Sequence, residues 1–133
     1  MNEAYFSTLG KILAFAAVVE VGTGLLLMID PALMAAVLIG AEVTGTAAAL
    51  ARLFGIALLA LGPACWPRRQ RAEDGSPAAL RGMLIYNVLV ALDLTYLGAI
   101  GPWHGALLWP AVALHAIVAL ALVWTWRAHN GVG

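Results

Sequence analysis

Residues 12–29 read ILAFAAVVEVGTGLLLMI, an apolar run that contains one charged side chain, Glu20. A helix needs about 20 apolar residues to cross the hydrocarbon core of a bilayer. The run is too long for the apolar core of a secretory signal, and no small-residue cleavage site is evident. We therefore interpret residues 7–29 as a retained transmembrane helix.

The rest of the chain has the composition of a membrane protein. Its 133 residues are 63% hydrophobic and 11% charged, whereas soluble domains carry about 25% charged residues. The mean hydropathy is +0.93. Four spans fill most of such a chain, so we expect no soluble domain. The predicted fold class is an all-α polytopic membrane four-helix bundle, with spans over residues 7–29, 46–66, 80–100 and 106–127.

Two connections have recognisable signals. Asp30 and Pro31 end the first span, because proline disfavours helical geometry in the residue before it. Asp30 can also cap a new helix with Pro31 at its first position, which predicts a short helix over 31–39 that ends at Gly40. It is too short to span a bilayer, so we expect it to lie in the interface or to be re-entrant. The hydrophilic stretch 67–79 is predicted to be a solvated loop.

The basic residues predict the orientation. Lys11, the four arginines of the 67–81 region and Arg127 fall on one side of a four-span bundle, and the other two loops contain no Lys or Arg. Basic residues favour the cytoplasmic side, so both termini and the loop 67–79 are predicted to be cytoplasmic. Tryptophans at both ends of the spans agree with this arrangement. Six of the seven basic residues are Arg, which hints at a GC-rich bacterium and hence at a bacterial inner membrane.

Four ionisable side chains lie inside predicted spans: Glu20, Arg52, Asp93 and His115. A charge at the bilayer centre costs about 2.5–3.5 kcal/mol, so such residues normally face the bundle interior. Counted from the outer helix ends, Glu20, Arg52 and Asp93 lie at depths of about 13 Å, about 9 Å and about 10 Å. We therefore expect Arg52 to pair with Asp93 or Glu20.

Neighbouring residues extend this candidate site. Tyr86 lies seven residues before Asp93 and Tyr96 three residues after it, so both tyrosines can share a helix face with the acid. They could equally be interface anchors. The charged cluster is either a structural ion pair that fixes helix register or a polar site for a head group, a proton or a small ligand. His115 is more often hydrogen-bonded to a neighbour in such a position than bound to a metal.

Other chemistry finds no support in the sequence. His104, His115 and His129 are too scattered for a metal or haem site. Phosphate-binding loops, nucleophile elbows and Cys-x-x-Cys motifs are absent, so we expect no cofactor and lean against an enzyme. A net charge of zero offers nothing to a nucleic acid. The expected partners are membrane lipids, together with a partner membrane subunit or further copies of the chain.

Two family resemblances accompany these features. Residues 20–25 (EVGTGL), the stop at Asp30-Pro31, and ARLFG at 51–55 with Gly62 resemble the first half of small four-helix bacterial membrane proteins of the DoxX-like kind. Some of those proteins are associated with quinone-linked redox complexes, and the resemblance implies such a role here. It covers about half of the chain and does not extend to the third span, which carries Asp93.

The second resemblance is to small multidrug transporters, whose first helix carries a membrane-embedded glutamate. Glu20-Val21-Gly22-Thr23 is similar to that pattern. The intramembrane Arg52 and Asp93 depart from it, as do the longer loop and the uneven distribution of basic residues. Two functions follow: a non-enzymatic accessory subunit or lipid- or quinone-binding protein, and a small proton-coupled transporter that uses Glu20.

Overall fold

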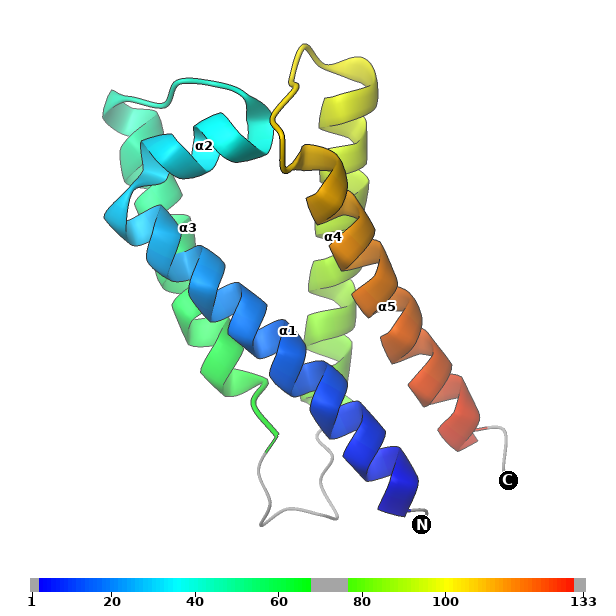
Figure 1. Ribbon diagram of the computed structural model, residues 1–133. Helices are drawn as coiled ribbons and strands as arrows, with labels where there is room; N and C mark the ends of the chain where they lie inside the picture. Colours follow the sequence, from blue (N-terminus) through cyan, green and yellow to red (C-terminus); the bar gives the residue numbers. More distant parts are fainter. Residues whose placement is uncertain (1–2, 68–76, 131–133) are drawn as a thin grey trace.

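The computed structural model describes residues 3–67 and 77–130, which form five helices and contain no strand (Figure 1). These are α1 (Glu3–Ile29), α2 (Pro31–Ile39), α3 (Gly45–Ala64), α4 (Pro77–Ile100) and α5 (Leu108–Asn130). All but α2 are long and apolar enough to cross a membrane. The predicted all-α fold, with a short helix between the first two of four spans, is confirmed. Most of the predicted loop 67–79 lies outside the described residues.

The turn between α1 and α2 follows from Asp30 and Pro31. The backbone N–H of Asp30 donates to the Leu26 carbonyl at 2.8 Å, and Pro31 has no N–H to continue the helix. The Asp30 carboxylate then accepts from the Leu33 N–H at 2.9 Å, which caps α2. Gly40 ends α2 with φ of 70°, a left-handed conformation that glycine adopts without strain. The chain therefore turns at both ends of the nine-residue helix α2.

The four long helices form two antiparallel pairs, α1 with α3 and α4 with α5 (Figure 1). Glycines allow close contact in the first pair: a Cβ atom on Gly24 would lie 2.8 Å from the Gly55 carbonyl oxygen, and the converse also holds. Gly62 packs against Ala17 and Val21 in the same way. Small residues let helix backbones approach in a membrane.

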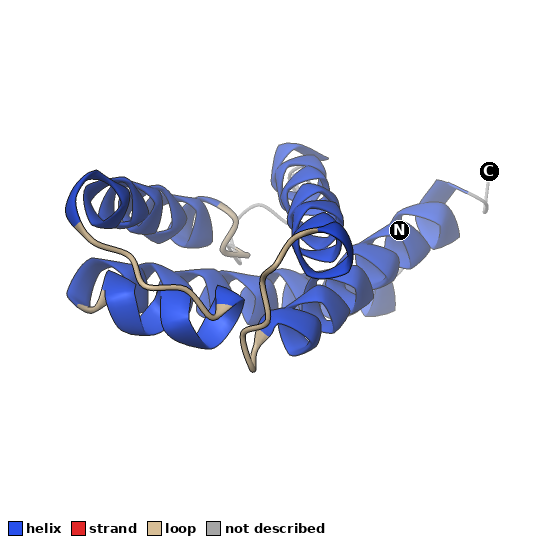
Figure 2. Ribbon diagram, turned by 90° about the horizontal axis from the view of Figure 1, so that it is seen from above, coloured by secondary structure: helices blue, strands red, loops and turns tan. Residues whose placement is uncertain are grey.

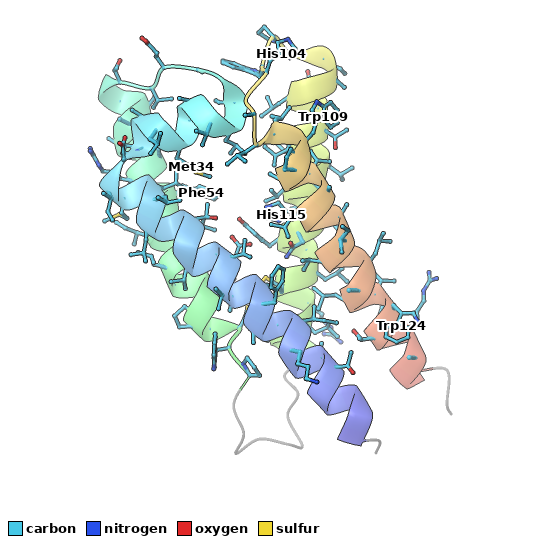
Figure 3. All side chains as sticks on the ribbon, in the orientation of Figure 1. Met34, Phe54, His104, Trp109, His115 and Trp124 are labelled. Atoms are coloured by element: carbon cyan, nitrogen blue, oxygen red, sulfur yellow. The ribbon has the colours of Figure 1, made fainter. Side chains whose placement is uncertain are left out.

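The two ends of the bundle differ. The start of α1, the end of α3, the start of α4 and the end of α5 lie together at one end, and α2 lies at the other (Figure 1). We call these the inner and outer ends, after the predicted orientation. Trp109 and Trp124, each more than half exposed, lie near the outer and inner ends of α5 (Figure 3). That is the arrangement expected of an aromatic belt.

The inner half closes around an apolar core. Met83 of α4 and Leu122 of α5 have no exposed surface, and Leu13 of α1 is 4% exposed. These side chains belong to one cluster to which α1, α4, α5 and Cys65 all contribute. Dispersion contacts of this kind hold helices together even where the surrounding lipid is as apolar as the core. The two helix pairs are therefore joined mainly at their inner ends.

The outer ends are joined through α2. The backbone N–H groups of His104 and Leu107, in the connection between α4 and α5, donate to the Ile39 and Val37 carbonyls at 3.2 and 2.8 Å. Carbonyl groups at a helix end have no partner within the helix. The connection supplies those partners, and α2 thereby spans from one helix pair to the other across the outer end (Figure 2).

Candidate functional site

A cavity of about 670 Å³ lies between the two helix pairs, beneath α2. All five helices contribute to its walls, and most of the lining side chains are apolar. Met34 of α2, Phe54 of α3 and His115 of α5 project toward this space (Figure 3). The cavity exists because the pairs meet in the inner half and are held apart by α2 in the outer half.

One side of the cavity is open. Helices α1 and α5 pack against each other on one side, whereas α3 and α4 make at most marginal contact on the other. From above, α3 and α4 stand apart (Figure 2). The lining residues Phe54 of α3 and Leu89 of α4 are 48% and 59% exposed. Because both helices are expected to lie in lipid, this opening faces the hydrocarbon core of the bilayer.

Polar groups in the cavity wall come mainly from α4 and α5. Tyr86, Asp93 and His115 line the cavity, together with Thr23 of α1. The rings of Tyr86 and His115 meet edge to face, with centroids 5.9 Å apart and planes at 75°. This is a favourable geometry for aromatic rings. The two rings lie at the inner end of the cavity, where Tyr86 packs against the apolar core of the inner half.

Asn87, which lies outside the cavity lining, orients His115 through a hydrogen bond. Its side-chain Nδ2 donates to the Met83 carbonyl at 2.8 Å, and its Oδ1 lies 2.9 Å from Nδ1 of His115. A carbonyl oxygen only accepts, so the amide must present its NH₂ to Met83 and its oxygen to the histidine. Nδ1 of His115 is therefore the ring nitrogen that carries the proton. Asn87 is 1% exposed, and burial of this kind requires its polar atoms to be paired.

Glu20 lies behind Tyr86. It is 1% exposed and does not line the cavity. Tyr86 is the polar side chain next to it across the α1–α4 interface. A buried carboxyl group without such a partner would be expensive in a membrane. Tyr86 thus lines the cavity and also lies beside the buried acid.

Three of the candidate residues named from the sequence lie together in the structure: Glu20, Tyr86 and His115. Asp93 lines the cavity further along α4 from Tyr86. Tyr96 is 60% exposed and outside the cavity lining. Asn87 was not among the predicted site residues, because an amide carries no charge that would mark it within an apolar span. An amide in an apolar span nevertheless needs a hydrogen-bond partner inside the bundle, so it also indicates a buried polar site.

Arg52 does not form the expected ion pair. Among residues 3–67 and 77–130, the structure shows no pairing of Arg52 with Glu20 or Asp93. Its Nε atom instead donates to the Met28 carbonyl at 3.4 Å, and its side chain is exposed. Phe54 lines the cavity, and a residue two positions earlier points about 200° away around the helix. Equal depth in the membrane did not bring Arg52 to the same side as the acids.

No family model, curated protein or solved structure matches this chain. The resemblances to DoxX-like proteins and to small multidrug transporters therefore stay predictions. No group of three or more His, Cys, Asp or Glu residues able to hold a metal occurs within the described ranges 3–67 and 77–130. What the site offers is an apolar chamber, open to lipid, with polar groups from two helices on one wall.

Proposed function

We propose that this protein is a non-enzymatic integral membrane protein that binds a lipid-soluble amphiphile, a quinone or a lipid, in the cavity between its helix pairs. The observation that carries the proposal is the cavity itself. Its volume of about 670 Å³ falls within the range of about 300–1,000 Å³ that small-molecule sites occupy. Such sites combine apolar walls with a few convergent polar groups, which is the composition of this one.

The direction of the opening supports a ligand that arrives from the membrane. The gap between α3 and α4 is lined by the apolar side chains of Phe54 and Leu89, and the exposed Asp93 lies one helical turn beyond Leu89. An apolar tail can stay in the hydrocarbon region while the head enters the cavity and approaches Tyr86, Asp93 and His115. Burial of apolar surface then contributes to affinity, and the polar groups orient the head.

Filling the cavity tests the proposal. Ala111 lines it, whereas Ala113, on the same helix, is exposed and outside the lining. We expect Ala111→Phe to weaken binding of a decyl-substituted benzoquinone by about tenfold or more, because the new ring occupies the space of the head group. Ala113→Phe is the matched control and should bind like the wild type. The measurement is equilibrium binding to protein in lipid nanodiscs.

The same two variants test a lipid as the occupant. Native mass spectrometry should detect a retained lipid on the wild type and on Ala113→Phe, and lose it from Ala111→Phe. Retention of lipid or quinone by Ala111→Phe at wild-type strength would place the binding site elsewhere and contradict the proposal.

A proton-coupled transporter that uses Glu20 is the second candidate. One observation favours it: Arg52 contacts the end of α1 and leaves Glu20 without a cationic partner among the described residues. It ranks below ligand binding because Glu20 lies outside the cavity lining, behind Tyr86. Substrate-driven proton flux in proteoliposomes decides the matter. Equal flux in the wild type and Glu20→Gln would remove this candidate.

A further inference from the structure

The hydrogen-bonding state of the cavity wall restricts the head group that the cavity can accept. Nδ1 of His115 carries the ring proton and donates it to Asn87, because the Met83 carbonyl fixes the orientation of that amide. In a neutral imidazole the other nitrogen, Nε2, then has a lone pair and no proton. Nε2 is therefore a hydrogen-bond acceptor.

Nε2 is also accessible. Among the described residues, no buried side-chain nitrogen or oxygen lacks a hydrogen-bond partner. The bond to Asn87 engages Nδ1 alone, so Nε2 must retain some surface. His115 is only 9% exposed and lines the cavity. The surface that Nε2 retains is therefore surface on the cavity.

The other polar groups in the wall add acceptors. The carboxyl group of Asp93 supplies two oxygens, and it lies about 9 Å along the helix axis from the position of Asn87. Tyr86 has one hydroxyl proton, and the neighbouring Glu20 competes for it. Thr23 can donate or accept. Acceptors therefore occur at several points of the wall, and Nε2 of His115 is the one whose role as an acceptor follows from its neighbours.

We propose that the cavity selects an amphiphile whose head bears hydroxyl donors, a phenol or hydroquinone ring, over the matching head that offers only carbonyl or ether oxygens. A hydroxyl group can donate to Nε2 of His115, whereas a quinone carbonyl placed there would face a lone pair. A hydroquinone has a second hydroxyl group on the opposite side of the ring, directed toward the Asp93 end of the cavity. This inference rests on the proposed function and specifies the chemistry of the ligand.

Paired probes that differ in their hydroxyl donors test the selection. The first pair is para-decylphenol and its methyl ether, which share the ring and the tail and involve no redox chemistry. The second is a decyl-substituted hydroquinone and the corresponding benzoquinone, compared under anaerobic conditions. One hydrogen bond to a buried acceptor corresponds to about a tenfold difference in dissociation constant at most. We expect each hydroxyl-bearing probe to bind about three- to tenfold tighter than its partner.

Two variants locate the preference. His115→Phe keeps a ring and removes Nε2, and it should abolish the preference for para-decylphenol over its ether. Because that change leaves Asn87 without its histidine, Asp93→Leu serves as the second variant and should reduce the preference of the hydroquinone over the benzoquinone. Tyr96→Phe removes a hydroxyl group on α4 outside the lining and should leave both preferences unchanged.

The outcomes separate this inference from the proposed function. Equal binding of both members of each pair, still lost in Ala111→Phe, would overturn the hydroxyl preference and leave cavity binding intact. A preference that persists at full size in both His115→Phe and Asp93→Leu would also overturn it. Failure of every probe to bind to a folded wild-type protein would count against the proposed function itself.

Discussion

The inner and outer halves of the bundle are built from the same four long helices, yet one is closed and the other is hollow. In the inner half, Met83 and Leu122 are fully buried between the pairs. In the outer half, the pairs separate around a cavity of about 670 Å³. The difference comes from α2, whose hydrogen bonds to the α4–α5 connection hold the outer ends at a fixed spacing.

The comparison separates stability from binding. Side chains in the inner half have neighbours on every side, so their loss leaves a void that the helices fill poorly. Side chains around the cavity already border empty space, and changing them alters the shape of the site more than the stability of the bundle. Polar residues lie at the boundary between the two halves, where Tyr86 and His115 line the inner end of the cavity and the buried Asn87 holds His115.

The largest effect on stability is expected in the inner half. Leu122→Ala removes a side chain with no exposed surface from the core, and we expect a loss of about 2–5 kcal/mol in the free energy of unfolding. Leu89→Ala changes the same residue type at a position that is 59% exposed at the cavity opening, and should cost less than about 1 kcal/mol.

Reversible unfolding in mixed detergent micelles measures both variants. If Leu122→Ala and Leu89→Ala lowered the free energy of unfolding by the same amount, the inner core would not be the main contact between the helix pairs.

An intermediate effect is expected at the boundary. Asn87→Leu removes the group that holds His115 and leaves Nδ1 unpaired, so we expect a loss of about 1–3 kcal/mol in the free energy of unfolding. The double variant Asn87→Leu, His115→Leu removes both partners and should recover part of that loss, because neither buried polar group remains.

Unfolding in micelles tests this prediction. The loss of free energy of unfolding in the double variant is compared with the sum of the losses in Asn87→Leu and His115→Leu. Two residues in contact are coupled, and their effects are then not additive. Strict additivity would mean that the hydrogen bond between Asn87 and His115 does not contribute to the fold.

The sequence was sufficient for the fold because each element has its own local signal. Four apolar runs of spanning length predict the long helices, and Asp30, Pro31 and Gly40 predict α2 to the residue. Hydropathy and helix capping depend on residues that are close together in the sequence, so both can be predicted without knowing the three-dimensional structure.

The site was predicted only in part because contacts between helices depend on their rotation. Of the four ionisable residues expected to face inward, Glu20 and His115 are buried, whereas Arg52 and Asp93 are exposed. Depth places a residue along the membrane normal but leaves its direction around the helix open, and Arg52 shows the consequence. The cavity itself depends on α2 and the α4–α5 connection meeting through backbone groups of Val37 and Ile39. Side-chain patterns carry no information about such bonds.

The smallest effect is expected at Arg52, in the outer half. Its Nε atom bonds the Met28 carbonyl near the end of α1, where Pro31 offers no N–H to the last turn. A cation at a helix C-terminus contributes about 0.3–1 kcal/mol at an exposed position. Arg52→Met keeps the apolar stem of the side chain and should lower the free energy of unfolding by no more than about that amount, whereas Arg52→Lys retains the charge and should change it less.

A buried ion pair would behave differently, because removing one partner of such a pair costs about 3–5 kcal/mol. The double variant Arg52→Met, Asp93→Ala therefore distinguishes the two arrangements. With Arg52 bound to the end of α1 and Asp93 in the cavity wall, the two effects should add within about 0.5 kcal/mol. Recovery of stability in the double variant would show that the two charges meet in the membrane, and would require α3 to be rotated from the position described here.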